Sequence, residues 1–216
     1  MTSAEGRLYH SWMSGKTGAP GFLDDYAWVV FACIELHSAT LDPDYLETAI
    51  GLQAVQDALF LDGTTGVYRF SSGEDGALDI PGTVETHDGA VPSGNSVTLL
   101  NLYRLWGLTG DTSMKRRADS LSAALSAGAV ASPAGHSMLV ASMLNGPDHV
   151  HVTLRGSRED PALVELHRAA LRAFSPDITL TFEEEEGAAS AVVCSKGACR
   201  PPVVSPAGLE GMLGPS

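Results

Sequence analysis

The sequence predicts a mainly α protein, in which an array of helical hairpins is followed by a small C-terminal β-α-β-β unit. Three observations predict this class. Apolar residues recur at three- and four-residue steps over much of the first two thirds of the chain, as they do along one face of a helix. A helix–turn–helix pattern occurs twice. After about residue 148 the pattern changes to the alternation that is typical of β-strands.

The first predicted hairpin joins two helices across a tight turn. Its first helix covers residues 22–40, with Asp24 and Asp25 in the first turn, where carboxylates suit the positive end of the helix dipole. Asp42 and Pro43 open the second helix, because Asp is a good N-cap and Pro is favoured at the first helical position.

The second predicted hairpin, residues 96–106 and 112–127, repeats the first at an offset of 69 residues. Paired helices bury their apolar faces against neighbouring pairs, so the repeat indicates a stacked α/α array, either a solenoid or a closed toroid. The repeated positions are Leu36, Thr40, Asp42, Tyr45, Ala49 and Leu52, matched by Leu105, Thr109, Asp111, Met114, Ala118 and Leu121.

Beyond the second hairpin the chain is expected to leave the all-helical pattern. We therefore divide it into a partial α/α region, 1–147, and a small α/β unit, 148–216, whose Pro/Gly-rich tail is expected to fray. Helices are expected at 134–144 and 161–174, and strands at 67–70, 149–154, 178–182 and 191–194.

Composition excludes two classes of partner. The net charge of −13 disfavours nucleic acid and anionic membrane surfaces, because both require basic patches. The apolar run 27–34 is far shorter than the ~20 residues of a membrane-spanning helix. The first residues lack the order of a secretory signal, and three cysteines make a poor disulfide framework, so we expect a cytoplasmic protein.

The segment 88–96, DGAVPSGNS, combines two glycines with a carboxylate, a carboxamide and two hydroxyls directly before an apolar helix. Such a loop places polar groups and free backbone N–H groups at a helix N-terminus, where a polar ligand could be held. A structural role also fits, because Ser93 or Asn95 makes a good N-cap.

Five blocks in this order resemble the spermatogenesis-associated protein 20 family, also described as thioredoxin-domain-containing proteins. They are RL…SW at 7–12, FLDDYA at 22–27, DGAVPSGNS at 88–96, NLYRL at 101–105 and AVVC…ACRPP at 191–202. The resemblance implies an N-terminal thioredoxin-like domain followed by an (α/α)₆ toroid, similar to six-hairpin glycosidases and N-acylglucosamine 2-epimerases. It therefore implies carbohydrate-related chemistry.

The chain departs from this family pattern because it matches only the C-terminal, toroid portion and contains no Cys-x-x-Cys. We therefore do not expect this chain to have the redox activity that a thioredoxin-like domain would supply. A partial toroid would leave apolar faces exposed. We expect another chain, a second copy or the missing N-terminal half to cover them, and the chain to be a split or truncated form.

Three carboxylates are the candidate catalytic residues: Asp24, Asp25 and Asp88. Acid/base chemistry on sugars commonly uses a pair of carboxyl groups across the scissile bond. Adjacent helical residues point about 100° apart, so either Asp24 or Asp25 can face a given site, but not both. For these two, helix position favours the structural role of helix capping and compensation of the helix dipole, and the catalytic role is the alternative.

Four further residues are candidate binding residues for a sugar or glycan. Ser93 and Asn95 could hydrogen-bond a polyol, and Tyr26 could offer an aromatic face, although an aromatic residue in an apolar helix is commonly core. His87 suits proton removal beside a sugar carbonyl because its pKa lies near neutrality. The family motif begins only at Asp88, which makes Asp88 the stronger candidate.

No cofactor or metal is expected. Cys194 and Cys199 lack the second ligand pair of a zinc site. His149 and His151 could in principle supply it, but the sequence favours a structural or reducible cysteine pair. The predicted function is sugar or glycan binding, with metal-free epimerase- or glycosidase-like chemistry if the chain is an enzyme. The alternative is a non-catalytic interaction module that docks on a thioredoxin-like partner or on the missing half, with the 88–96 loop as a structural clasp.

Overall fold

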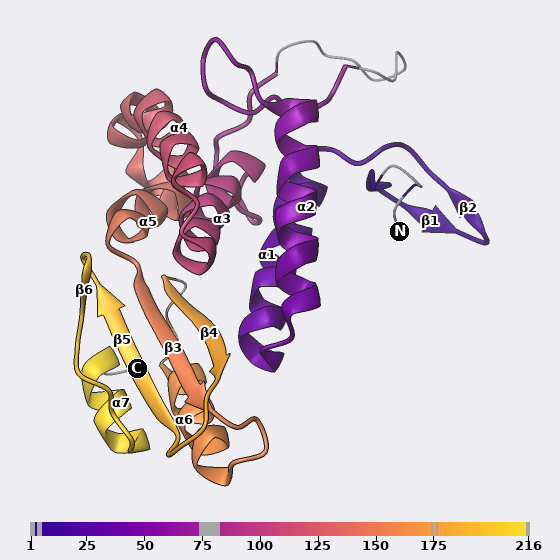
Figure 1. Ribbon diagram of the computed structural model, residues 1–216. Coiled ribbons are helices and arrows are strands. Elements are labelled where there is room, and N and C mark those ends of the chain that lie inside the picture. Colours follow the sequence, from indigo (N-terminus) through magenta and orange to yellow (C-terminus); the bar gives the residue numbers. More distant parts are fainter. Residues whose placement is uncertain (1–2, 4–5, 74–82, 174, 176, 215–216) are drawn as a thin grey trace.

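The computed structural model describes residues 3, 6–73, 83–173, 175 and 177–214. Helices α1 to α5 lie together, and a sheet with two further helices lies beside them (Figure 1). The mainly α class with a C-terminal α/β unit is thereby confirmed. The helices are α1 Leu23–Thr40, α2 Pro43–Phe60, α3 Gly94–Thr109, α4 Thr112–Ala131, α5 Ser137–Asn145, α6 Pro161–Arg172 and α7 Pro206–Leu213.

The helical array is built from two hairpins that pack through their first helices. α1 packs on α2 and on α3, and α3 packs in turn on α4 and α5. One apolar cluster fills the space between these helices, with Tyr26, Ile34, Phe60, Leu102 and Leu121 among its fully buried members. Within the described residues, no helix is both long and apolar enough to cross a membrane.

The repeat predicted from the sequence is present as two turns of the same construction. In each copy a threonine hydroxyl donates to the carbonyl oxygen four residues earlier at 2.7 Å, and an aspartate caps the next helix. The residue between them has a positive φ, 57° at Leu41 and 71° at Gly110. Leu41 holds this unfavourable conformation because its side chain is buried in the apolar cluster of the C-terminal unit.

Several predicted elements differ from the structure in extent. α3 begins at Gly94 rather than at residue 96, because Ser93 is the N-cap. The strand expected at 67–70 is only a single bridge between Leu61 and Tyr68. The helix expected at 134–144 is split into a 3₁₀ turn, Pro133–Gly135, and α5.

The C-terminal unit has a four-stranded sheet in the order β4-β3-β5-β6. β3 and β4 are parallel and joined through α6, whereas β5 is antiparallel to β3. The predicted β-α-β-β order is confirmed. The expectation of a frayed tail is wrong, since the tail forms α7 and buries Leu209 in the unit's apolar cluster. The strands are β3 Val150–Gly156, β4 Ile178–Glu184, β5 Ser190–Ser195 and β6 Ala198–Cys199.

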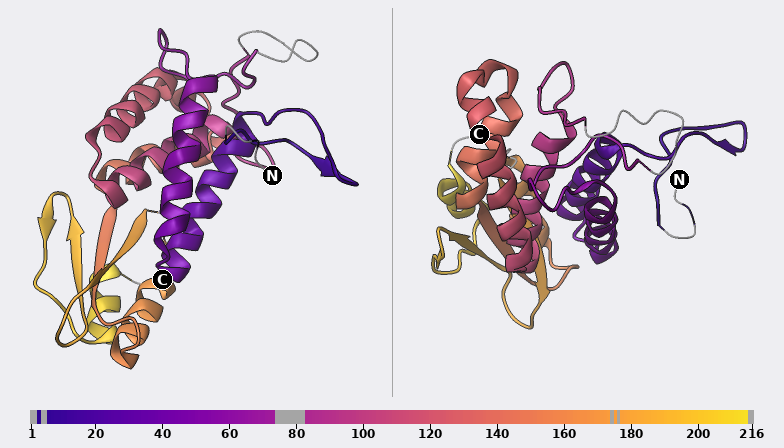
Figure 2. Two further views of the ribbon diagram at one scale, coloured as in Figure 1. Left: turned by 45° about the vertical axis from the view of Figure 1, so that its right-hand side comes forward. Right: turned by 90° about the horizontal axis from the view of Figure 1, so that it is seen from above.

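A short antiparallel hairpin of β1, Trp12–Met13, and β2, Lys16–Thr17, projects away from the helices (Figures 1 and 2). Every residue from 10 to 20 is exposed. We call this segment, residues 10–20, the N-terminal arm.

Candidate functional site

The N-terminus of α3 gathers most of the candidate site residues. Ser93 caps the helix, since its hydroxyl accepts from the backbone N–H of Ser96 at 3.3 Å. Gly94 donates its N–H to Asp24 Oδ1 at 2.9 Å, which ties the start of α3 to the start of α1. A glycine is required there, because a Cβ would overlap the Asp24 carboxylate and the side chain of Leu23.

Asp88 is buried and spends both carboxylate oxygens on the backbone. Oδ1 accepts from the N–H of Ser93 at 3.0 Å. Oδ2 accepts from the N–H groups of Met138 and Leu139 at 2.8 and 3.1 Å, in the first turn of α5. Asp88 thus holds the loop before α3 against the N-terminus of α5.

Asn95 is also buried, and its amide pairs entirely with backbone. Oδ1 accepts from the N–H of Tyr68 at 3.0 Å. Nδ2 donates to the carbonyl oxygens of Tyr68 and Glu85 at 2.9 and 2.8 Å. Asn95 and Asp88 therefore act as clasps between distant segments, which is the structural alternative considered for the 88–96 loop.

The two aspartates of α1 have different surroundings. Asp25 accepts from the N–H of Phe22 at 2.8 Å in a capping box and lies 2.9 Å from Nδ1 of His10. Asp24 is partly buried, and burial raises the pKa of its carboxyl group. The charges of Glu85 and Asp25 act in the same direction, while the hydrogen bond from Gly94 opposes them.

Of the remaining candidates, one lies in the core and the other is exposed. Tyr26 is 1% exposed, its hydroxyl accepts from the N–H of Leu8 at 2.8 Å, and its ring packs edge-on against Phe60. His87 is exposed, with its ring 6.2 Å from that of His136. The structure thus brings Asp24, Asp88, Ser93 and Asn95 together. Their catalytic and binding roles stay predictions.

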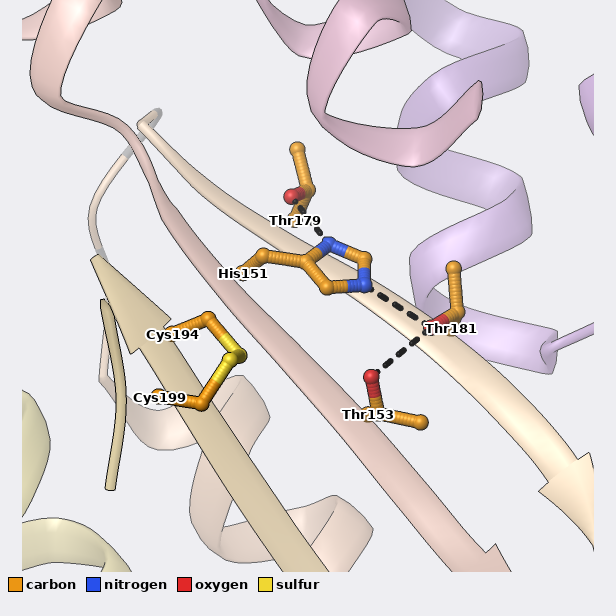
Figure 3. The surroundings of a disulfide bond; sticks show 6 residues. All are labelled: His151, Thr153, Thr179, Thr181, Cys194 and Cys199. Atoms are coloured by element: carbon orange, nitrogen blue, oxygen red, sulfur yellow. Dashed lines mark hydrogen bonds between the residues drawn. A yellow bond between two sulfur atoms is a disulfide. The ribbon is translucent and has the colours of Figure 1, made fainter. Parts of the chain in front are cut away.

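Cys194 and Cys199 form a disulfide between paired positions of β5 and β6 (Figure 3). His151 faces away from it, with Nδ1 2.9 Å from Thr179 Oγ1 and Nε2 3.0 Å from Thr181 Oγ1. Burial lowers the pKa of His151 to about 4. The zinc arrangement of these cysteines with two histidines is therefore not formed. In the described part of the chain, no three His, Cys, Asp or Glu side chains group to hold a metal ion.

Sequence reasoning missed two polar contacts between the hairpins, each with one partner that is largely buried. Arg104 on α3 is 2% exposed and lies 2.6 Å from the carboxylate of Glu35 on α1. Asp57 on α2 accepts from the hydroxyl of Tyr68 at 2.6 Å and pairs with Arg117 on α4. Apart from the offset of 69 residues between Glu35 and Arg104, neither contact has a sequence signal, because charged residues are usually exposed.

Known proteins were compared with the chain. No family model matches it. The chain is 29% identical to human spermatogenesis-associated protein 20 over 240 residues, which covers 98% of this chain and 30% of the human protein. The rat protein of the same name is 41% identical over 116 residues, 50% of this chain and 15% of the rat protein. The resemblance predicted from the sequence is confirmed.

The matched regions are only parts of these relatives, since the chain spans less than a third of human spermatogenesis-associated protein 20. Among solved structures, a GH76 alpha-mannanase from Bacteroides thetaiotaomicron gives a TM-score of 0.44 at 14% identity, over 56% of this chain and 31% of the mannanase chain. That TM-score is below 0.5, so the assignment to the mainly α class rests on the helices of this chain and not on the mannanase.

Proposed function

We propose that this chain is an interaction module: a helical-hairpin part of a larger toroid protein that docks on the neighbouring part through its N-terminal arm. The exposed apolar end of that arm carries the proposal. Trp12 is 56% exposed and Met13 is 78% exposed. Large apolar side chains grouped on a projecting segment are typical of a protein–protein contact, where Trp and Met are enriched.

The arm is held in shape by its own backbone. The N–H of His10 donates to the carbonyl oxygen of Ala19 at 2.9 Å, and that of Gly18 donates to Ser11 at 2.8 Å. Leu8 anchors the base, where it is buried beside Tyr26. A segment that is ordered before binding loses less conformational entropy when it docks.

The hydrogen bonds of the 88–96 loop support the same role. Asp88 and Asn95 are committed to backbone groups, so they hold the hairpins in register. A ligand that used these side chains would have to break bonds that are already made.

The partner we propose is the remainder of a protein of the relatives' length, in the same or a separate chain. The match to the human relative covers 98% of this chain but 30% of that protein. The resemblance implies that the remainder contains a thioredoxin-like domain and further hairpins of an (α/α)₆ toroid. Trp12 and Met13 would then pack between those hairpins.

The test is complex formation between this chain and the polypeptide of the same organism that matches the rest of the human relative. Light scattering after size exclusion should show a one-to-one complex. Trp12→Ser with Met13→Ser should weaken it at least tenfold, because hot-spot side chains are worth about 2 kcal/mol or more. The control, Val130→Ser, replaces a valine on α4 that is 80% exposed and should leave binding unchanged.

Two results would contradict the interaction proposal. One is an arm variant that binds as tightly as the unaltered chain. The other is self-association of the chain through the arm, which would assign Trp12 and Met13 to a second copy.

A second candidate function is acid/base chemistry on a sugar or glycan, favoured by Asp24. A partly buried carboxyl group with a raised pKa beside other carboxylates suits the general acid of glycosidic cleavage. Asp24→Asn should lower turnover of a responsive glycan about 10²–10⁴-fold. Asp42→Asn, at the N-cap of α2, is the matched control. If the unaltered chain, alone and in its complex, turns over no glycan or sugar, this candidate falls.

A further inference from the structure

A cavity of about 420 Å³ lies where the hairpins meet the C-terminal unit. Helices α1 and α3 form one side, and β4 with α6 and the residues after it form the other. Its size falls within the roughly 300–1,000 Å³ of small-molecule sites, whose walls are mostly apolar with a few polar groups. Its lining includes Phe31, Glu35, Ser38, Arg104, Leu171 and Leu180.

Arg104 supplies an unused donor to this cavity. Its side chain is 2% exposed, and Nη1 lies 2.6 Å from Glu35 Oε1 in an ion pair. Nε has no hydrogen-bond partner among the described residues. The guanidinium carbon lies 5.3 Å from the centre of the Phe31 ring, so the Arg104 charge and the Phe31 ring lie on the same side of the cavity. A buried N–H without an acceptor is costly, and a ligand oxygen would remove that cost.

Ser38 supplies a second unused group, one helical turn beyond Glu35 on α1. The residue is 6% exposed, and its Oγ has no hydrogen-bond partner in the described parts of the chain. Its carbonyl oxygen is occupied, because it accepts from His167 Nε2 at 2.7 Å. The hydroxyl is free to donate or to accept.

The charges around the cavity select the kind of ligand. Arg104 is paired with Glu35, and the charge of Asp177 also acts on it, so the local sum is negative. An anionic ligand would be repelled by the two carboxylates. An ammonium group would leave the Arg104 Nε–H unpaired, because it carries no acceptor.

We propose that this cavity binds a small neutral ligand, made of an apolar ring that carries an uncharged amide. The amide oxygen accepts from Arg104 Nε, and the amide N–H donates to Ser38 Oγ. The ring packs between Phe31 and Leu180. This inference goes beyond the proposed interaction function, since it uses neither the N-terminal arm nor the loop before α3.

Three probes with the same ring and different heads test the ligand class on the intact chain: benzamide, benzoate and benzylamine. Titration followed by methyl NMR should give saturable shifts for benzamide, largest at Leu171 and Leu180. Benzoate and benzylamine should bind about tenfold more weakly or worse. Benzoate carries a negative charge that the nearby carboxylates repel, and benzylamine has no acceptor for Arg104 Nε.

Two variants and a control locate the site. Leu171→Trp should fill the cavity, because Leu171 lines it and is 42% exposed, and should abolish benzamide binding. Leu144→Trp alters an exposed leucine on α5 outside the lining and should leave binding unchanged. Ser38→Ala should weaken binding about two- to tenfold, the loss of one hydrogen bond, without lowering the melting temperature.

The proposal is overturned if benzamide gives no saturable shift below about 10 mM, the weak end of measurable affinity. Equal binding of all three probes, or benzamide binding that survives Leu171→Trp, overturns it as well. None of these results bears on the complex formed through the N-terminal arm, so the two proposals fail separately.

Discussion

Replacement of Asp88 by alanine tests the clasp directly. The Asp88 side chain is 7% exposed, and its two oxygens accept three backbone N–H bonds from Ser93, Met138 and Leu139. Alanine removes both acceptor oxygens, and with them all three hydrogen bonds, while leaving the backbone of the loop in place. The loss should therefore appear as lost stability, whatever ligand or partner the protein has.

The magnitude follows from two contributions. Loss of an N-cap, here that of α5, costs about 0.5–2 kcal/mol. A buried N–H left without a partner, here that of Ser93, costs about 1–3 kcal/mol. Water can reach the partly exposed Met138, which reduces the cost there. We expect a decrease in the free energy of unfolding of about 2–4 kcal/mol, or roughly 5–15 °C in melting temperature for a chain of this size.

Thermal and urea unfolding followed by circular dichroism measure this change. Asp111→Ala is the matched control, since Asp111 caps α4 through the N–H of Ser113 at 2.8 Å but is exposed. Its loss should cost about 1 kcal/mol. If Asp88→Ala costs no more than Asp111→Ala, the three buried bonds do not hold the loop and the clasp interpretation fails.

Three further changes have predicted outcomes. In urea melts, Gly94→Ala should destabilise the protein by about 1–3 kcal/mol, because the new Cβ overlaps Asp24. Gly51→Ala, in open space on α2, should stabilise the protein by about 0.5–1 kcal/mol, and equal effects of the two substitutions would contradict the packing argument. Reduction of the disulfide between β5 and β6 should lower the free energy of unfolding by about 2 kcal/mol, the value that chain entropy gives for so short a loop, while the circular dichroism spectrum is retained. An unchanged melting temperature after reduction would contradict this prediction. The pKa of His151 is about 4 in the folded state and 6.5 in the unfolded state, so between these pH values the unfolded state binds one more proton. The free energy of unfolding should therefore fall by at most roughly 3 kcal/mol from pH 7 to pH 4. In urea melts, His151→Gln should flatten this pH dependence, and an equally steep dependence in the variant would assign the pH dependence to other groups.

The parts of the fold that the sequence predicted well are those whose contacts are local. In the repeated turn, the bonds that both copies share join residues no more than four positions apart, so residue type at fixed spacing determines the geometry. The N-caps Asp42 and Asp111 follow the same rule. The tail of the chain was missed because the burial of Leu209 depends on a sheet formed by residues far away in sequence.

The candidate site was predicted as a group of residues but not as a set of bonds. Asp88 reaches Met138 across 50 positions, and Gly94 reaches Asp24 across 70. A carboxylate near free helix N–H groups has the same sequence pattern whether those groups belong to its own chain or hold a ligand in place. Spacing within the loop could not separate these cases, because the deciding partners lie on α1 and α5.

The pair of Glu35 and Arg104 has one sequence signal that reasoning about single motifs passes over. The two residues stand 69 positions apart, the offset of the repeat itself, and so occupy equivalent places in α1 and α3. Two helices that pack through corresponding faces bring equivalent positions together. Like charges at such a position would repel at short range, whereas opposite charges attract. Opposite charges at one repeat position therefore indicate that the first helices of the two hairpins face each other, as α1 and α3 do.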